Sequence, residues 1–458
     1  MIKKDTIAAI STAMNNSGIG IVRMSGDEAF NIIKKIFRPF KNKDISQCSS
    51  HTVHYGYIVD GENTVDEVLV LVMKGPHTYT REDTVEIDCH GGMFVLNKTL
   101  DLVIKNGARP ADPGEFTQRA FINGRIDLSQ AEAVIDVINA QNDYALKSAV
   151  SQLGGSVSEK IKSIRSVILE QTAYIEAALD DPEHLEMDGY GNVLLPVLLQ
   201  CKDEVDKLID SANDGRIIKE GIKTVILGKP NAGKSSFLNS LAGFDRAIVT
   251  DIAGTTRDIL EESIRIRDIT LNITDTAGIR NTEDIIEKIG VDKAREYARD
   301  ADLIVYVADT SVPLDKNDYD IIDLIKNKKV ITLLNKSDLP PAWDKKGLEK
   351  IIKGPFVECS AKNGTGIEQF EDTVRQMFYN KDIKFNDQIY ITNARQKNSL
   401  IKASKSLNAA IETINSGLSE DFYTIDMMDA YTSLGEVIGE AIEDDLADEI
   451  FSKFCMGK

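Results

Sequence analysis

The sequence predicts a multidomain protein with an α+β N-terminal domain, an all-α helical domain, and an α/β domain inserted into the helical one. The chain has 458 residues, and at about 150 residues per domain this length corresponds to about three domains. Apolar residues recur with helical spacing both before and after a segment in which strands and helices alternate. We therefore expect domains at residues 1–119, at 120–220 together with 380–458, and at 221–379.

Residues 5–119 predict the α+β domain. Apolar or alternating runs at residues 6–10, 19–23, 68–72 and 84–88 have the pattern of strands, and turn residues separate them. Arg23 and Glu86 lie on two of these strands, where each alone is typical of a surface charge. The pair Cys89 and His90 can suggest a metal or catalytic site, but two adjacent ligand types without partners are more typical of a turn at a strand end.

Helical patterns follow at residues 128–138, 158–178 and 193–212. After residue 379 the chain becomes helical again, and its apolar residues fall on one helix face: Leu407, Ala410, Ile411 and Ile414. The segment between these helical parts is therefore an insertion, which a loop tip tolerates because the two ends of an insert lie close together.

The inserted segment alternates strand and helix. Its predicted strands are residues 224–228, 270–274, 302–308, 330–334 and 356–359. This pattern predicts a mainly parallel sheet covered on both faces, with its ligand beyond the carboxyl ends of the strands.

Residues 228–235 have the sequence GKPNAGKS and fit the phosphate-binding loop pattern G-x-x-x-x-G-K-[ST] at every fixed position. An apolar strand precedes them and a helix follows, as the motif requires. The glycines allow backbone N–H groups to face phosphate oxygens, and Lys234 can reach the β- and γ-phosphates. Ser235 is placed to bind Mg²⁺.

Three further motifs indicate guanine nucleotides. Residues 275–278 (DTAG) offer Asp275 to Mg²⁺ through water and the Gly278 N–H to the γ-phosphate, and Thr256 in GTT can complete the metal shell. Residues 335–338 (NKSD) place the Asp338 carboxylate to accept hydrogen bonds from guanine N1 and N2, a donor pair that adenine lacks. Residues 360–362 (SAK) supply a backbone N–H for the guanine O6.

The residue after DTAG is Ile279, whereas signalling GTPases have a glutamine there that orients the attacking water. Hydrolysis must therefore recruit another group. Arg257 and Arg280 lie nearby in the sequence, but neither is assigned as an arginine finger.

The composition limits the functions and the cellular locations that the sequence allows. The formal net charge of −19 gives no global sign of nucleic-acid binding, so contact with RNA depends on a local basic patch. The five cysteines lack C-x-x-C spacing, which fits a reducing compartment and gives no zinc signature. No apolar run approaches membrane-spanning length, and we expect a cytoplasmic protein without membrane contact.

The chain resembles the MnmE (TrmE) family of tRNA modification GTPases over essentially its whole length. The resemblance rests on the motifs RMSG (23–26), HGG (90–92), PGEF (113–116), RAFINGR (119–125) and FCMGK (454–458). Small departures occur at residues 15–17, at Arg81, where glycine is common, and at residues 180–182.

The resemblance implies a homodimer that works with the flavoprotein MnmG (GidA) in a heterotetrameric complex. Such a complex installs an aminomethyl or carboxymethylaminomethyl group on C5 of the wobble uridine of tRNA, with 5-formyl-tetrahydrofolate or a related tetrahydrofolate as carbon donor. GTP hydrolysis drives a conformational cycle, and K⁺ joins two nucleotide domains in place of an arginine finger.

The family's site residues carry over position by position. The folate positions correspond to Arg23, Glu86, Arg125 and Lys458, and the K⁺ ligands to Asn231, Thr250, Ile252 and Thr255. Glu287 corresponds to the residue that orients water, although a solvated helix charge is the ordinary explanation; Cys455 is a candidate catalytic thiol or a small buried residue. Motifs and resemblance together predict these GTP-binding residues: Asn231, Ala232, Gly233, Lys234, Ser235, Ser236, Thr250, Asp251, Ile252, Ala253, Gly254, Thr255, Thr256, Asp275, Thr276, Ala277, Gly278, Asn335, Lys336, Asp338, Ser360, Ala361 and Lys362.

One alternative stays open at this point. A GTP-switched binding factor, such as a ribosome-assembly GTPase, has the same nucleotide motifs and uses its flanking domains only to grip RNA or protein. Such a factor is expected to carry a basic RNA-binding module, and the N-terminal region has none visible in its sequence.

Overall fold

The computed structural model describes residues 5–41, 44–181, 184, 189–244, 261–266, 269–274, 297–378, 389–440, 444–452, 454 and 457. It divides into two compact units. The first contains Met1–Ile138, Ser151–Val205 and Asn398–Lys458, and the second contains Asn139–Val150 and Asp206–Lys397. The three-domain boundaries expected from the sequence stay a prediction.

The first unit contains a seven-stranded sheet with the order β3-β4-β5-β6-β2-β1-β7. Every neighbouring pair is antiparallel except β1 and β7. All four strands predicted in this region are present. The strands are β1 (Ile7–Ile10), β2 (Ile19–Ser25), β3 (Phe37–Pro39), β4 (Thr52–Asp60), β5 (Asn63–Met73), β6 (Thr84–His90) and β7 (Arg109–Pro110).

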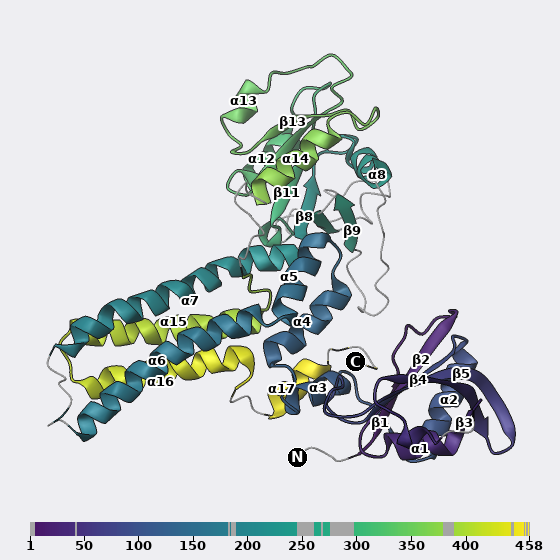
Figure 1. The fold of residues 1–458 in the computed structure, drawn as a ribbon. Helices are drawn as coiled ribbons and strands as arrows, with labels where there is room; N and C mark the ends of the chain where they lie inside the picture. Colours follow the sequence, from purple (N-terminus) through teal and green to yellow (C-terminus); the bar gives the residue numbers. More distant parts are fainter. Residues whose placement is uncertain are drawn as a thin grey trace. The chain divides into compact units, whose positions relative to one another are not determined.

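Helices α1 (Ala29–Ile36) and α2 (Met93–Lys105) cover one face of this sheet (Figure 1). Because side chains alternate along a strand, Val22 and Met24 of β2 are fully buried in that core. Arg23, between them in sequence, lies on the other face, directly opposite Glu86 of β6. The two charged residues are therefore held on the sheet face that α1 and α2 leave uncovered.

The remaining helices of the first unit include α3 (Glu115–Ile122), α6 (Ser156–Asp180), α16 (Glu420–Ile438) and α17 (Asp444–Ser452). α6 and α16 pack side by side (Figure 1). Between them, Arg165 forms an ion pair with Glu440 and lies 4.0 Å from the Tyr431 ring centroid. Phe451 of α17 and Phe454 pack against Ala120 and Leu128, so the C-terminal segment is built into the core beside α3.

Other helices are α4 (Leu128–Asn139), α5 (Asp143–Leu153), α7 (Tyr190–Glu220) and α15 (Ala394–Asn415). The predicted helices at 128–138 and 158–178 match α4 and α6 closely. α7 is longer than the predicted helix at 193–212 and contains Pro196 in its N-terminal part. None of the described helices is long and apolar enough to span a membrane.

The second unit contains a six-stranded sheet with the order β13-β12-β11-β8-β10-β9. All five predicted strands are present as β8 (Ile222–Leu227), β10 (Ile269–Thr274), β11 (Leu303–Asp309), β12 (Val330–Asn335) and β13 (Phe356–Glu358). These five are parallel. The sequence analysis missed β9 (Glu261–Ile266), an antiparallel strand at the edge of the sheet.

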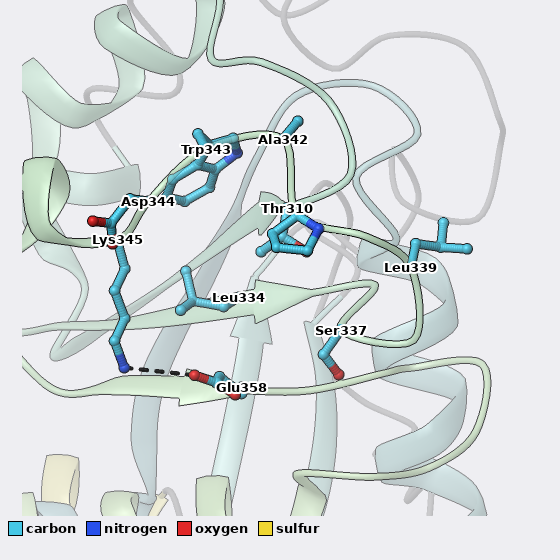
Figure 2. Close-up of a pocket in the computed structure, with 10 residues that line it drawn as sticks. Thr310, Leu334, Ser337, Leu339, Ala342, Trp343, Asp344, Lys345 and Glu358 are labelled. Carbon is cyan, nitrogen blue, oxygen red and sulfur yellow. Dashed lines mark hydrogen bonds and ion pairs between the residues drawn. The ribbon is translucent and has the colours of Figure 1, made fainter.

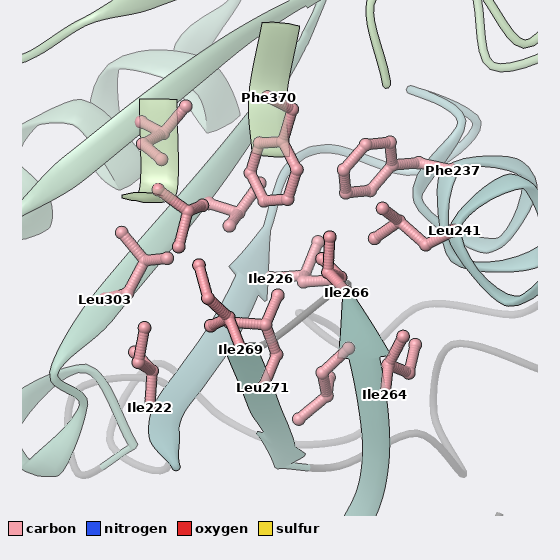
Figure 3. Close-up of a cluster of buried hydrophobic side chains, with 14 of the residues drawn as sticks. Ile222, Ile226, Phe237, Leu241, Ile264, Ile266, Ile269, Leu271, Leu303 and Phe370 are labelled. Carbon is pink, nitrogen blue, oxygen red and sulfur yellow. The ribbon is translucent and has the colours of Figure 1, made fainter. Parts of the chain in front are cut away.

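Helices cover both faces of this sheet. On one face, α8 (Lys234–Phe244) and α14 (Ile367–Phe378) pack on apolar strand residues, and Phe237 meets Phe370 edge to face at 5.1 Å between ring centroids (Figure 3). On the other face lie α12 (Lys316–Ile325) and the short α13 (Lys346–Glu349). The expected α/β fold is therefore confirmed, and its core fixes the strand ends that carry the nucleotide motifs.

Candidate nucleotide and N-terminal sites

The phosphate-binding loop links β8 to α8 and lies against the ends of β11 and β12. A Cβ atom on Gly228 would lie 2.5 Å from the Val307 carbonyl oxygen. Gly233 has φ +98°, and a Cβ there would lie 2.1 Å from Asn335 Nδ2. Both positions therefore require glycine. The loop can approach these strands closely only because Gly228 and Gly233 have no side chains.

Lys234 begins α8, and its head group folds back over the loop. Nζ donates hydrogen bonds to the carbonyl oxygens of Gly228 at 2.7 Å and Lys229 at 2.9 Å. The positive charge lies beside the N-terminus of α8, whose dipole also attracts anions. From this position the loop motif predicts that the same ammonium group, which has three N–H donors, reaches the β- and γ-phosphates.

Asn335 joins three of the predicted motifs. Its side chain is buried, Nδ2 donates to the Ala232 carbonyl at 2.7 Å, and Oδ1 accepts from the Ala361 N–H at 3.0 Å. One amide thus links the phosphate loop, the end of β12 and the loop after β13. Asn335 acts here as a structural connector.

Asp338 is exposed and accepts a hydrogen bond from Ser360 Oγ at 2.7 Å. This hydrogen bond holds the pKa of Asp338 below its ordinary value, so the carboxylate is ionised and acts as an acceptor at neutral pH. Lys336 has φ +63°, and its Nζ lies 2.6 Å from Oδ2 of the buried Asp309. These contacts fix the conformation of the NKSD loop.

A cavity of ≈ 570 Å³ adjoins this loop (Figure 2). Ser337 and Leu334 line one part of it, and Lys345 pairs with Glu358 across it at 3.5 Å. Trp343, the single tryptophan of the chain, donates from Nε1 to the Asp309 carbonyl at 3.1 Å. The sequence analysis did not identify this cavity and did not single out Trp343, because no motif marks either one.

Part of the predicted nucleotide site lies outside the described residues. That part comprises Thr250, Asp251, Ile252, Ala253, Gly254, Thr255, Thr256, Asp275, Thr276, Ala277, Gly278 and Glu287. Within the described part, Ser235 lies in the first turn of α8, the position of a Mg²⁺-binding hydroxyl. Asn231 is exposed on the loop with φ +61° and offers an amide oxygen, a ligand type that a monovalent cation accepts.

The N-terminal site brings together residues from distant segments. Arg23 Nε lies 2.7 Å from Glu86 Oε1, and the two side chains are 18% and 17% exposed. Arg23 Nη1 also donates to the Gly457 carbonyl at 3.1 Å. The interpretation of each residue alone as an ordinary surface charge is therefore wrong, because they form a largely buried pair.

Tyr79 connects this pair to Arg125. The Arg125 guanidinium lies 4.7 Å from the Tyr79 ring centroid, and that of Arg23 lies 6.0 Å from the same ring. The Tyr79 hydroxyl hydrogen-bonds Thr117 Oγ1 at 2.9 Å, which fixes the ring. The sequence analysis missed Tyr79, since nothing in its local pattern distinguishes it from other aromatic residues of the domain.

The C-terminal segment contacts the first two strands and the loop between them. The Gly457 carbonyl also accepts from Ser11 Oγ at 3.0 Å. Gly457 has φ +86°, and a Cβ atom there would lie 2.5 Å from the Ile10 carbonyl oxygen. Cys455 and Lys458 lie outside the described residues, but Gly457 between them is held at the N-terminal site. The C-terminus of the chain therefore contributes to this site.

Cys89 and His90 point to opposite sides of β6. Cys89 is buried in the core, whereas the His90 side chain is 70% exposed and pairs with Asp66 at 2.7 Å. The hydrogen bond that the His90 ring donates to the Asp66 carboxylate raises the pKa of His90 above its ordinary value. Side chains on opposite sides of a strand cannot bind one metal ion together, and this geometry agrees with the strand-end interpretation.

Comparisons with known proteins agree with this architecture. Two family models match the chain: GTP-binding protein TrmE N-terminus over residues 6–125 and MnmE helical domain over residues 128–455. The chain is 53% identical to the tRNA modification GTPase MnmE of Lachnoclostridium phytofermentans, with 100% of both chains covered. It is 46% identical to that of Clostridioides difficile, again with 100% of both covered.

Among solved structures, the G domain of the T. maritima FeoB iron transporter matches 34% of this chain and 97% of its own, at 29% identity. Its TM-score is 0.26, too low to carry an argument. Family membership is shown by the full-length relatives and by the two family models. The chain belongs to the MnmE family of tRNA modification GTPases.

Proposed function

We propose that this GTPase is the nucleotide-hydrolysing part of a complex that modifies C5 of the wobble uridine in tRNA. The group added is of the aminomethyl or carboxymethylaminomethyl type, and its carbon comes from 5-formyl-tetrahydrofolate or a related tetrahydrofolate. The observation that carries the proposal is the N-terminal site, where Arg23 holds both Glu86 and the Gly457 carbonyl. A factor that only binds RNA or protein does not require this cluster of Arg23, Glu86 and the C-terminal segment.

The residues at this site fit a folate. Arg23 and Arg125 provide guanidinium groups for the carboxylates of the glutamate tail, and Glu86 provides an acceptor for the pterin N–H donors. The Tyr79 ring between the two arginines offers a flat surface for an aromatic ring of the ligand. The folate supplies the one-carbon unit when bound.

Lys458 and Cys455 complete the proposed site. Lys458 is a further cation, and Cys455 is the thiol that assists the reaction on the folate carbon or uridine C6.

In the nucleotide site, we propose that Ser235 and Thr256 bind Mg²⁺, and that Asn231, Thr250, Ile252 and Thr255 bind K⁺ between two nucleotide domains. A monovalent cation neutralises charge that develops on the phosphates, as an arginine does in other GTPases. Glu287 orients the attacking water, because Ile279 cannot do so. The exposed loop position of Asn231 supports this assignment.

The β4–β5 part of the N-terminal sheet supports a homodimer. There Val53, Tyr55 and Leu69 are 56%, 43% and 43% exposed, on the same side of the sheet as Arg23 and Glu86. Apolar side chains gathered on a sheet face are typical of a protein interface. We propose that the dimer joins MnmG (GidA) in a heterotetramer that acts on tRNA in the cytoplasm.

Nucleoside analysis of tRNA tests the proposal. Cells that lack the protein are expected to accumulate unmodified wobble uridine at C5, and the wild-type gene is expected to restore the modification. The alternative, a ribosome-assembly factor, predicts unchanged wobble uridines and altered ribosomal particles. Family membership favours the modification enzyme, and unchanged uridines in the deletion strain would contradict it.

A further inference from the structure

Lys229 is the second residue of the phosphate loop, at a position that the motif leaves variable, yet its side chain is only 9% exposed. It turns toward β11 and α12, away from the α8 terminus where Lys234 lies. Nζ is 2.7 Å from Asp318 Oδ2 and 3.4 Å from Asp315 Oδ2, and it donates to the Pro313 carbonyl at 3.3 Å. An ammonium group with three partners is fully satisfied there.

Asp318 is a rigid anchor for this ammonium. It is fully buried, accepts the Tyr306 hydroxyl at 3.0 Å, and closes the capping box of α12 by accepting the Asp315 N–H at 3.0 Å. Burial acts to lower the pKa of Lys229, but the ion pair with Asp318 outweighs it, and the pKa is raised. Lys229 is therefore charged at neutral pH.

The backbone of the same lysine contacts the phosphate-binding lysine. The Lys229 carbonyl accepts from Lys234 Nζ at 2.9 Å and from the Ala232 N–H at 3.3 Å. Lys229 is thus tied through its side chain to α12 and through its carbonyl to the residue that must reach the β- and γ-phosphates. A rotation of the Lys229 peptide would move the carbonyl that guides Lys234.

We propose that Lys229 is a positioning residue for GTP: its ion pair with Asp318 fixes the loop backbone so that Lys234 is aimed at the β- and γ-phosphates. Because Lys234 acts on these two phosphates, loss of the anchor weakens GTP binding more than GDP binding and slows hydrolysis. A purely structural role predicts instead that affinity for both nucleotides follows the stability of the fold.

Removal of one charge alone would leave the other buried without a partner and destabilise the protein. The main variant is therefore Lys229→Met with Asp318→Asn, which removes both charges and keeps an amide oxygen for the Tyr306 hydroxyl. Lys229→Arg preserves the ion pair as a rescue. Lys326→Met removes an exposed lysine that pairs with Asp323 just after α12 and serves as the matched control.

Urea unfolding, GTP and GDP affinities, and kcat and KM are measured on the full-length chain. We expect the double variant to bind GTP about tenfold more weakly, the effect of one charge-assisted hydrogen bond. The loss for GDP is expected to be smaller, kcat is expected to fall, and Lys229→Arg and Lys326→Met are expected to match the wild type. Equal losses for GDP and GTP, or wild-type affinity and kcat in the double variant, would overturn the proposal.

A second variant covers the case in which the double variant does not fold. Lys229→Gln keeps an N–H donor for Asp318 but removes the charge, so the anchor is weakened without a large change in packing. Its ratio of GTP to GDP affinity is expected to fall below that of the wild type. An unchanged ratio together with an unchanged kcat would overturn the proposal.

Discussion

The nucleotide site and the N-terminal site are built in opposite ways. In the nucleotide site, each described motif is a short contiguous stretch at the end of a parallel strand, and Asn335 alone links three of them. In the N-terminal site, Arg23 meets a carbonyl 434 residues away and Arg125 joins through Tyr79. The first site therefore depends on loop geometry, and the second depends on the packing of distant segments.

The largest expected effect is on the N-terminal site. Cys455→Ser is expected to abolish tRNA modification and leave GTP hydrolysis and folate affinity nearly unchanged, because the proposed role of the thiol is in the reaction and not in either binding event. Nucleoside analysis and a phosphate-release assay measure the two activities. Ser452→Ala, in the exposed end of α17, is the control and keeps full modification. Full modification by Cys455→Ser would contradict a catalytic role and leave Cys455 as a small buried residue.

In the nucleotide site, Asp338→Asn is expected to lower GTP affinity about 100-fold, because the guanine N1 and N2 donors lose a charged acceptor. Affinity for xanthosine triphosphate is expected to rise, since its C2 carbonyl accepts where guanine donates. Titration of both nucleotides measures the change. Asp344→Asn, an exposed carboxylate near the same loop, is the control, and an unchanged preference in Asp338→Asn would remove Asp338 from base recognition.

The packing that assembles the N-terminal site depends on Glu115. Burial acts to raise its pKa, but hydrogen bonds from Arg109 at 2.6 Å and Arg119 at 3.0 Å hold the pKa below its usual 4.5. Glu115→Gln is expected to lower the free energy of unfolding by about 2 kcal/mol at neutral pH. Asp112→Asn is the control, because the Asp112 side chain pairs with the same Arg109 but is 84% exposed. Its effect on the free energy of unfolding is expected to be small.

The sign of the pH dependence follows from the lowered pKa. The carboxylate stabilises the fold above its unfolded-state pKa, and this contribution is lost as the pH falls through the lower folded-state pKa. The difference in unfolding free energy between wild type and Glu115→Gln is therefore expected to be constant above pH 5 or so and to shrink below 4.5. Urea titrations at several pH values measure it, and a difference that grows on acidification would contradict the ion-pair account.

The smallest expected effect concerns the cation. GTP turnover is expected to be higher in K⁺ than in Na⁺, and Asn231→Ala is expected to lower the K⁺-stimulated rate about tenfold with nucleotide binding largely kept. Asn239→Ala, an exposed residue of α8, is the matched control. Equal rates in the two salts would exclude the cation from the mechanism.

The contrast between the two sites also explains what the sequence could predict. The parallel strands β8, β11 and β12 of the second sheet are largely buried and consist mainly of apolar residues, so they were found directly. β10 and β13 were found from shorter apolar stretches. β9 was missed because only Ile264 and Ile266 of its EESIRI sequence are apolar, and it is recognised only by its pairing with β10. Edge strands carry little local signal.

For the sites, contiguous motifs identified Lys234, Asn335 and Asp338 directly. The N-terminal residues came only from the resemblance to a family, since no spacing in the chain links Arg23 to Gly457. The departure at Arg81 has a physical explanation in the structure: its φ is +63°, a conformation that favours glycine. Lys229 was not singled out because its role arises from contacts with α12, which the loop motif does not encode.

The most direct test of the assembled N-terminal site is calorimetric titration of the full-length protein with 5-formyl-tetrahydrofolate. Arg23→Ala removes the guanidinium that holds Glu86 and the Gly457 carbonyl. Arg38→Ala removes an exposed arginine that lies 5.6 Å from the Tyr57 ring in the same sheet and is the matched control. We predict binding by the wild type and by Arg38→Ala, and affinity reduced about tenfold or more in Arg23→Ala. Equal affinity in the wild type and Arg23→Ala, or no binding by the wild type, would contradict a folate site at this position.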